Sequence, residues 1–141
     1  YAVRVGGGVN HRFGLDDAIL IKDNHIKIAG GIRAAIEAAR SADDRAHRLE
    51  IEVATLEELQ EALRHDVDAI LLDNMKPDMV RQAVALVRAD RRGTKILVEA
   101  SGGITLDNVH EFAEAGVDWV SIGALTHSAP AVDMSFKIQP V

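Results

Sequence analysis

Two basic side chains and two histidines gather near the start of the sequence, in the stretch GGGVNHRFGLDDAILIKDNH at residues 6–25. Arg12 has a planar guanidinium group that can bind a carboxylate through two parallel hydrogen bonds, and Lys22 carries a compact point charge. His11 and His25 can donate hydrogen bonds, or add positive charge when protonated. The pattern predicts a site for a small anion. The alternative interpretation is that the glycines form a flexible turn and that each histidine is structural.

Three carboxylates lie where predicted strands would present them to one side of a sheet. In the run Leu49–Val53, alternation places Glu50 and Glu52 on one face and the apolar side chains on the other. Asp73 ends the next predicted strand, within reach of Glu52. Two buried carboxylates side by side repel each other unless a cation or a proton separates them, and oxygen ligands favour Mg²⁺. The alternative is that these carboxylates form ion pairs with nearby lysines or arginines.

Two glycine-containing loops follow consecutive predicted strands, SGGI at Ser101–Ile104 and SIGALTHS at Ser121–Ser128. Glycines after a strand let backbone N–H groups approach a ligand closely, and the positive amino end of a following helix also attracts anions. Many α/β barrels bind a phosphate group in the loops after their last two strands. The pair of loops therefore indicates a phosphate site, with two tight strand-to-helix turns as the alternative.

Strand-like and helix-like segments alternate from residue 49 onward. Thr55 and Glu58 form a capping-box pattern, and Pro77 stands where the first residue of a helix is expected. The predicted strands are Ala18–Ile21, Leu49–Val53, Ala69–Leu72, Lys95–Val98 and Trp119–Ile122, with a possible further strand in the tail MSFKIQPV. The predicted helices are Ile32–Ser41, Thr55–Leu63, one beginning at Pro77, and Leu106–Ala115. This alternation indicates an α/β fold with a parallel sheet.

Almost every predicted strand ends in polar residues or glycines, in the clusters KDNH, EVAT, DNM, EASGG and SIGALTHS. Because ligands bind at the carboxyl ends of strands in parallel α/β folds, we expect these clusters to meet at one mouth. The alternative is that strand ends need polar turn residues in any case. Together, the motifs predict binding of a small anionic ligand that carries at least one phosphate, with Mg²⁺.

The overall composition narrows the class of protein. The chain has 141 residues, 48% of them hydrophobic, which suits one globular domain or a large piece of one. Its formal net charge of −6 argues against general affinity for nucleic acid or for an anionic membrane surface. It has no cysteine, which excludes disulfides and thiolate metal sites. No apolar run approaches the ~20 residues that span a bilayer, and a signal-peptide layout is missing, so we expect a soluble cytoplasmic domain.

Five segments together resemble one protein family: GGGVNHRFGLDDAILIKDNHI, LEIEVATLEE, AILLDNM, EASGGIT and VDWVSIGALTHSAPAVDMSF. Their order and spacing are similar to those of quinolinate phosphoribosyltransferases, also called carboxylating nicotinate-nucleotide pyrophosphorylases. The resemblance extends from Tyr1 to about Phe136. It implies transfer of a phosphoribosyl group from 5-phosphoribosyl 1-pyrophosphate to quinolinate, with Mg²⁺. Decarboxylation accompanies the transfer, and the products are nicotinate mononucleotide, pyrophosphate and CO₂, in NAD biosynthesis.

The resemblance also implies roles for individual residues. His11, Arg12 and Lys22 match positions that bind the carboxylates of quinolinate. Glu52 and Asp73 match the acidic pair near the metal and the ribose, and with Lys22 they are the expected catalytic residues. The residues that match the binding loops for the 5-phosphate are Ser101, Gly102, Gly103, Ile122, Gly123 and Ala124.

The resemblance implies that residues 1–141 form the C-terminal portion of an open, TIM-like α/β barrel domain. An N-terminal α/β domain, the first barrel strands and a basic Thr-Arg-Lys segment would precede them. The family works as a homodimer or a higher homo-oligomer in which the partner contributes an arginine. His25 lies in a family motif and is expected to have a supporting role. Two alternatives stay open: an inactive half-barrel that binds phosphate or assembles with another chain, and a related phosphoribosyltransferase with another acceptor.

Overall fold

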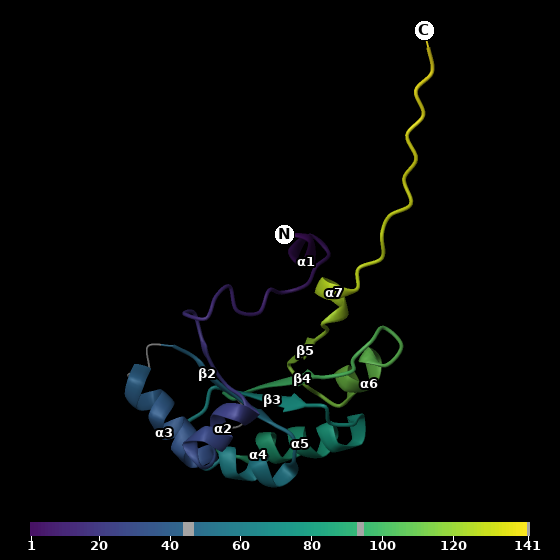
Figure 1. Cartoon of the computed structure of the whole chain (residues 1–141). Coiled ribbons are helices and arrows are strands. Elements are labelled where there is room, and N and C mark those ends of the chain that lie inside the picture. The colour runs from purple at the N-terminus through teal and green to yellow at the C-terminus, as the bar shows by residue number, and fades with distance from the viewer. Residues whose placement is uncertain (44–46, 93–94, 141) are drawn as a thin grey trace.

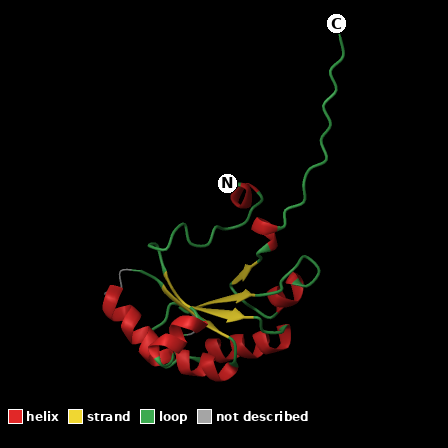
Figure 2. Cartoon of the chain, in the orientation of Figure 1, coloured by secondary structure: helices red, strands yellow, loops and turns green. Residues whose placement is uncertain are grey.

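The computed structural model describes residues 1–43, 47–92 and 95–140. Five parallel strands form one sheet in the order β1-β2-β3-β4-β5. The strands are β1 (Ile19–Ile21), β2 (Leu49–Val53), β3 (Ala69–Asp73), β4 (Leu97–Ser101) and β5 (Trp119–Ser121). The helices are α1 (Ala2–Val5), α2 (Asp23–Ala29), α3 (Ile32–Asp43), α4 (Leu56–Ala62), α5 (Pro77–Ala89), α6 (Val109–Glu114) and α7 (Ala124–His127). At least one helix connects each strand to the next, which confirms the predicted parallel α/β fold (Figure 2).

The main helices cover one face of the sheet, and the chain before β1 crosses the other side (Figure 1). Leu49, Ile51 and Val53 of β2 point into the helix layer, where each is at most 1% exposed. They pack there in one core with apolar residues of α3, α4 and α5. The alternate residues of β2, Glu50 and Glu52, therefore face the side that the N-terminal segment crosses. This one-sided layering leaves the opposite face of the sheet available for a site.

Local sequence signals set where two helices begin. Thr55 Oγ1 accepts a hydrogen bond from the backbone N–H of Glu58 at 3.1 Å, as predicted. A capping box predicts that the Glu58 carboxylate accepts a hydrogen bond from the backbone N–H of Thr55. It instead accepts one from the backbone N–H of Ala54, one residue earlier, at 2.7 Å. Pro77 is the first residue of α5, where its missing N–H would have no helical partner in any case. None of the helices in the described ranges has the length and apolar character that a bilayer crossing requires.

Two predicted starts differ by two or more residues because side chains and turns intervene. β4 begins at Leu97, since Lys95 lies in a turn and donates its backbone N–H to the Arg92 carbonyl at 2.7 Å. α6 begins at Val109 rather than at Leu106. The Asn108 side chain accepts a hydrogen bond from the backbone N–H of Thr105 at 2.8 Å and closes a turn before the helix.

The strand predicted in the tail MSFKIQPV is wrong. Residues 129–140 contain neither helix nor strand, and Met134, Phe136 and Ile138 are 83%, 88% and 82% exposed. A strand needs a neighbouring edge for its backbone hydrogen bonds. The tail instead runs away from the sheet and finds no such edge (Figure 1).

Candidate functional site

Three predicted site residues lie at the carboxyl ends of adjacent strands. Lys22 follows β1, Glu52 lies near the end of β2, and Asp73 ends β3. Burial and the negative charge of Asp73 raise the pKa of Glu52, while the positive charge of Lys22 opposes that shift. The three groups therefore act on one another electrostatically. Both carboxylates are only partly buried, so the expectation of a buried pair is wrong, because this end of the sheet is open to water.

His25 holds the turn that carries Lys22. Its Nδ1 accepts a hydrogen bond from the backbone N–H of Lys22 at 3.0 Å, which caps the start of α2. Lys27 Nζ donates to the Asp23 carboxylate at 2.7 Å one turn further along the helix. The hydrogen bond to Lys22 gives His25 a structural role beside the site.

Asn74, which the sequence analysis did not assign a role, connects Asp73 to the first glycine loop. Its side-chain amide donates to the Asp73 carboxylate at 2.8 Å, and its backbone N–H donates to the Ser101 carbonyl at 2.9 Å. Asn74 has a left-handed backbone with φ of 53°, which asparagine tolerates better than most residues. Gly102 has a φ of +96°, and a Cβ there would lie 2.9 Å from the Asn74 backbone nitrogen. The Asn-Gly contact therefore fixes the Ser101–Gly103 loop next to Asp73.

The two predicted phosphate loops follow β4 and β5, which are adjacent strands. A cavity of about 590 Å³ brings Ser101, Ile122 and Gly123 together with His11 and Arg12 of the N-terminal segment. The lining does not include Gly102, Gly103, Ala124, Lys22, Glu52 or Asp73. The structure thus gathers the predicted site residues into two groups: a strand-end group of Lys22, Glu52 and Asp73, and a cavity group that joins the NHR motif to the glycine loops.

Arg12 and Lys22 lie at opposite ends of β1. The Arg12 Nη1 donates to the carbonyl of Ala18, the residue before β1, at 3.3 Å. Lys22 is the residue after the same strand. Arg12 and His11 also line a second cavity of about 330 Å³ that reaches Arg48 and Trp119 at the amino ends of β2 and β5. The structure does not bring the Arg12 guanidinium and the Lys22 ammonium groups together.

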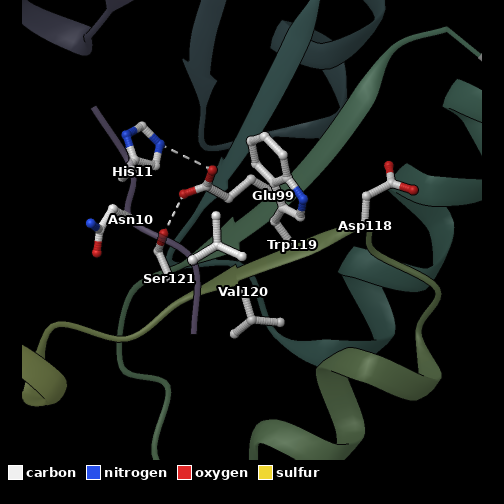
Figure 3. A pocket seen from close by; sticks show the side chains of 8 residues that line it. Asn10, His11, Glu99, Asp118, Trp119, Val120 and Ser121 are labelled. Carbon is white, nitrogen blue, oxygen red and sulfur yellow. Dashed lines mark hydrogen bonds and ion pairs between the residues drawn. The ribbon is translucent and has the colours of Figure 1, made fainter. Parts of the chain in front are cut away.

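Among the residues that the structure describes, the buried carboxylates are Glu50 and Glu99, each 1% exposed. His11 Nε2 lies 3.2 Å from Glu99 Oε2, and Ser121 Oγ donates to Glu99 Oε1 at 2.5 Å (Figure 3). His11 Nε2 also lies 3.5 Å from Glu50 Oε2. Arg48 lies 3.8 Å from the Glu50 carboxylate. Burial, and then the nearby charge of Glu99, raise the pKa of Glu50. The second oxygen of Glu50, Oε1, has no hydrogen-bond partner.

Sequence reasoning missed Glu99, although the signal was present. Glu99 stands two residues before Ser101 on β4, so alternation places both side chains on one face of the sheet. The donor atoms of His11, Glu50 and Glu99 lie within 4.8 Å of one another and could hold a metal ion. Arg48 already supplies positive charge beside Glu50. The cluster is therefore a charge network on the inner face of the sheet, the face that the N-terminal segment crosses.

Comparisons with known proteins show the family to which the chain belongs. A family model described as quinolinate phosphoribosyl transferase, C-terminal domain, matches residues 1–137. A probable nicotinate-nucleotide pyrophosphorylase (carboxylating) from Methanocaldococcus jannaschii is 48% identical over 140 residues, which cover 98% of this chain and 49% of the relative. The human nicotinate-nucleotide pyrophosphorylase (carboxylating) is 41% identical over 138 residues, which cover 98% of this chain and 46% of the relative.

A solved structure is similar over the same region. The crystal structure of NadC from Streptococcus pyogenes superposes with a TM-score of 0.86 at 43% sequence identity, covering 97% of this chain and 46% of that one. The chain spans about half the length of the curated relatives it matches. From the family match, the relatives and the shared fold, the chain belongs to the quinolinate phosphoribosyl transferase family.

Proposed function

We propose that this chain is the C-terminal portion of a phosphoribosyltransferase that makes nicotinate mononucleotide from quinolinate and 5-phosphoribosyl 1-pyrophosphate. Pyrophosphate and CO₂ are the other products. The observation that carries the proposal is the cavity of about 590 Å³, in which the NHR motif faces the two glycine loops. A histidine and an arginine beside backbone N–H groups are suited to two anionic substrates that must meet. The family of the chain supports the same reaction.

Quinolinate is a dicarboxylate, and His11, Arg12 and Lys22 are the residues that we propose to bind it. The Arg12 hydrogen bond to Ala18 is 3.3 Å long, just beyond the usual range of about 2.7–3.2 Å, and is therefore weak. A substrate carboxylate offers the guanidinium two shorter, charge-assisted bonds, so Arg12 exchanges Ala18 for the substrate. His11 already lines the same cavity. Lys22 completes the site when its flexible side chain reaches over the end of β1.

The phosphate of the second substrate would lie against Ser101, Gly102, Gly103, Ile122, Gly123 and Ala124. The Asn108 side chain donates to the Gly103 carbonyl at 3.1 Å and accepts from the Thr105 N–H at 2.8 Å, which holds the first loop open. The Gly103 φ of +63° is a conformation that glycine adopts without strain. Fixed backbone donors bind a phosphate at little cost in conformational entropy.

The carboxylates of Glu52 and Asp73 fit a Mg²⁺ ion. They lie on adjacent strand ends and are partly exposed, and their mutual repulsion contributes to the raised pKa of Glu52. Mg²⁺ usually keeps several waters and binds one or two carboxylates together with substrate phosphates. When bound, Mg²⁺ neutralises charge that develops on pyrophosphate as it departs. Lys22, whose charge acts on Glu52, balances the remaining negative charge of the pair.

In the proposed reaction the chain binds, orients and stabilises, and it forms no covalent bond to the substrates. The pyridine nitrogen attacks the anomeric carbon while the bond to pyrophosphate breaks, and the sugar gains positive charge in the transition state. Glu52 and Asp73 stabilise that charge as fixed carboxylates. The ring nitrogen is then cationic, so the adjacent carboxylate leaves as CO₂ and a proton replaces it. His11 and Arg12 hold the ring in the orientation that both steps require.

We further propose that the sheet is part of an open, TIM-like barrel and that the active form is a cytoplasmic homodimer or a higher homo-oligomer. Strands in sequence order with helices on one face support the barrel. Among the described residues, β1 and β5 each have one unpaired edge, at which further strands would add. The isolated chain is expected to be inactive. Light scattering of the complete protein measures its oligomeric state.

A turnover assay tests the proposed function. The complete natural protein that carries this sequence is incubated with Mg²⁺, 5-phosphoribosyl 1-pyrophosphate and either quinolinate or nicotinate, and products are separated chromatographically. We expect nicotinate mononucleotide and CO₂ in equal amounts from quinolinate only. If nicotinate gives product and quinolinate does not, the protein is a related transferase with another acceptor. No product from either acceptor, with phosphate binding retained, would favour a non-catalytic protein.

A further inference from the structure

One buried carboxylate ties three separate segments of the chain together. Glu99 lies in β4, its Oε1 accepts a hydrogen bond from Ser121 of β5, and its Oε2 lies 3.2 Å from His11 of the N-terminal segment. Figure 3 shows His11 and Ser121 at different oxygens of this one carboxylate. Glu99 is 1% exposed, and it also borders a cavity of about 240 Å³. The proposed reaction gives this residue no role.

The contact fixes which way the His11 ring faces. Two carboxylate oxygens, from Glu99 and Glu50, are the nearest acceptors to His11 Nε2, at 3.2 Å and 3.5 Å. Carboxylates accept hydrogen bonds, so Nε2 carries the proton in this arrangement. The other ring nitrogen, Nδ1, points away from Glu99, and it has no hydrogen-bond partner in the described part of the chain (Figure 3). Glu99 thus fixes the ring through Nε2, and Nδ1 can donate to a substrate carboxylate when it is protonated as well.

We propose that Glu99 is a positioning residue for the pyridine dicarboxylate: anchored by Ser121, it orients His11 and thereby holds the adjacent Arg12 at the cavity. This inference rests on the proposed function, and it adds a residue that touches neither substrate. A carboxylate that orients a histidine through one ring nitrogen is a common device in binding sites. Here the histidine comes from a segment without helix or strand, residues 8–18, so it depends on such an anchor.

Glu50 is a weaker candidate for the same role. It lies further from His11 Nε2, at 3.5 Å, and it shares its Oε2 with Arg48 at 3.8 Å. Its Oε1 has no hydrogen-bond partner, whereas both oxygens of Glu99 have one. A doubly anchored carboxylate has a fixed orientation, which is what a positioning residue requires. Glu50 therefore adds negative charge near His11, while Glu99 sets the geometry.

The effect should fall on one substrate more than on the other. Glu99 contacts His11 directly, and it reaches the glycine loops only through Ser121 and the strand that carries Ser101. We expect Glu99→Gln to raise the KM for quinolinate roughly tenfold, the order of one charge-assisted hydrogen bond, and to change the KM for 5-phosphoribosyl 1-pyrophosphate less than about twofold. A general loss of folding would change both constants and the melting temperature together.

A double-mutant cycle in the complete natural protein tests the proposal. His11→Ala, Glu99→Gln and the double variant are compared with the parent for KM, kcat and melting temperature. If Glu99 acts through His11, its substitution changes the KM for quinolinate less than about twofold once His11 is alanine. Glu114→Gln is the matched control, because Glu114 lies 3.6 Å from His110 at the surface. It should leave both KM values unchanged.

Ser121→Ala provides a second variant should Glu99→Gln fail to fold. It keeps the Glu99 charge but removes the hydrogen bond to Oε1, and we expect a rise of about threefold in the KM for quinolinate. Additive effects of His11→Ala and Glu99→Gln, or an unchanged KM in both single variants at Glu99 and Ser121, would overturn the positioning role. A parent protein without turnover would refute the proposed function instead, so the two failures are distinguishable.

Discussion

The two groups of site residues are built in different ways. Lys22, Glu52 and Asp73 occupy the ends of three adjacent strands, are partly or fully exposed, and follow from the register of the sheet. His11 and Glu99 are 88 residues apart in sequence and meet on the inner face of the sheet. The strand-end group therefore depends on the pairing of the strands, whereas the cavity group depends on a long-range contact between His11 and buried Glu99.

The comparison shows how the same charge has different consequences. At the strand ends, water and Lys22 moderate the repulsion between Glu52 and Asp73. On the inner face, Glu50 and Glu99 have little solvent, so His11 and Arg48 must balance them. The partly exposed carboxylates at the strand ends suit an exchangeable ion, while the buried carboxylates Glu50 and Glu99 suit a fixed geometry.

The largest effect is expected in the cavity group. Arg12→Ala should lower kcat/KM for quinolinate about 100-fold, or roughly 3 kcal/mol, because a bidentate charge-assisted contact is lost. Steady-state kinetics and calorimetric titration with quinolinate measure the change. Arg33→Ala is the control, since Arg33 is exposed on α3 and lies 4.0 Å from Glu37. A loss of similar size in both variants would contradict a specific role for Arg12.

The next effect concerns the junction between the two groups. Gly102→Ala should lower the free energy of unfolding by about 2 kcal/mol, because its φ of +96° and the Asn74 backbone at 2.9 Å leave no room for a Cβ. Gly103 has a φ of +63° and open space around it, so Gly103→Ala should lower the free energy of unfolding by about 1 kcal/mol through backbone strain alone. Denaturant unfolding compares the two. Equal costs would show that the contact with Asn74 is unimportant.

A smaller and more selective effect is expected at the strand ends. Glu52→Gln should raise the Mg²⁺ concentration needed for half-maximal activity about tenfold, because one of the two carboxylates loses its charge. The KM for quinolinate should stay unchanged, in contrast to the variants of the cavity group. Activity titrations with Mg²⁺ measure this, with Glu57→Gln on the exposed side of α4 as the control. A change in the KM for quinolinate without one in the Mg²⁺ requirement would reverse the assignment of the two groups.

The smallest effect concerns stability and pH. The folded-state pKa of Glu50 is raised, first by burial and then by Glu99, so the folded state binds its proton more tightly than the unfolded state does. The stability that this proton binding contributes is fully present below the pKa of Glu50 in the unfolded state. It is lost as pH rises through the pKa of Glu50 in the folded state. Glu50→Gln should therefore raise the melting temperature at neutral pH and lose this advantage in acid. Calorimetry from acid to neutral pH, with exposed Glu37→Gln as the control, measures the difference. A lower melting temperature at neutral pH would mean that His11 and Arg48 stabilise ionised Glu50 more than burial disfavours it.

Most of the regular structure could be predicted from local patterns. The β2 strand, the Thr55 cap and the Pro77 helix start follow from alternation, side-chain hydrogen bonding and ring geometry, which involve neighbouring residues only. The tail strand failed because residues 134–138 have strand-like composition but no edge to pair with. Glu99 was missed because its partner, His11, lies outside any regular element.

The sequence by itself determined the parallel α/β order, the face of each strand and the set of motifs, because alternation and capping act between residues that are close along the chain. Only the tertiary structure decided that His11 meets Glu99, that Asn74 fixes Gly102, and that Arg12 binds the Ala18 carbonyl at the opposite end of β1 from Lys22. Such contacts depend on where the connecting segments run once the sheet has formed, and burial then decides which carboxylates keep their water and which must find partners.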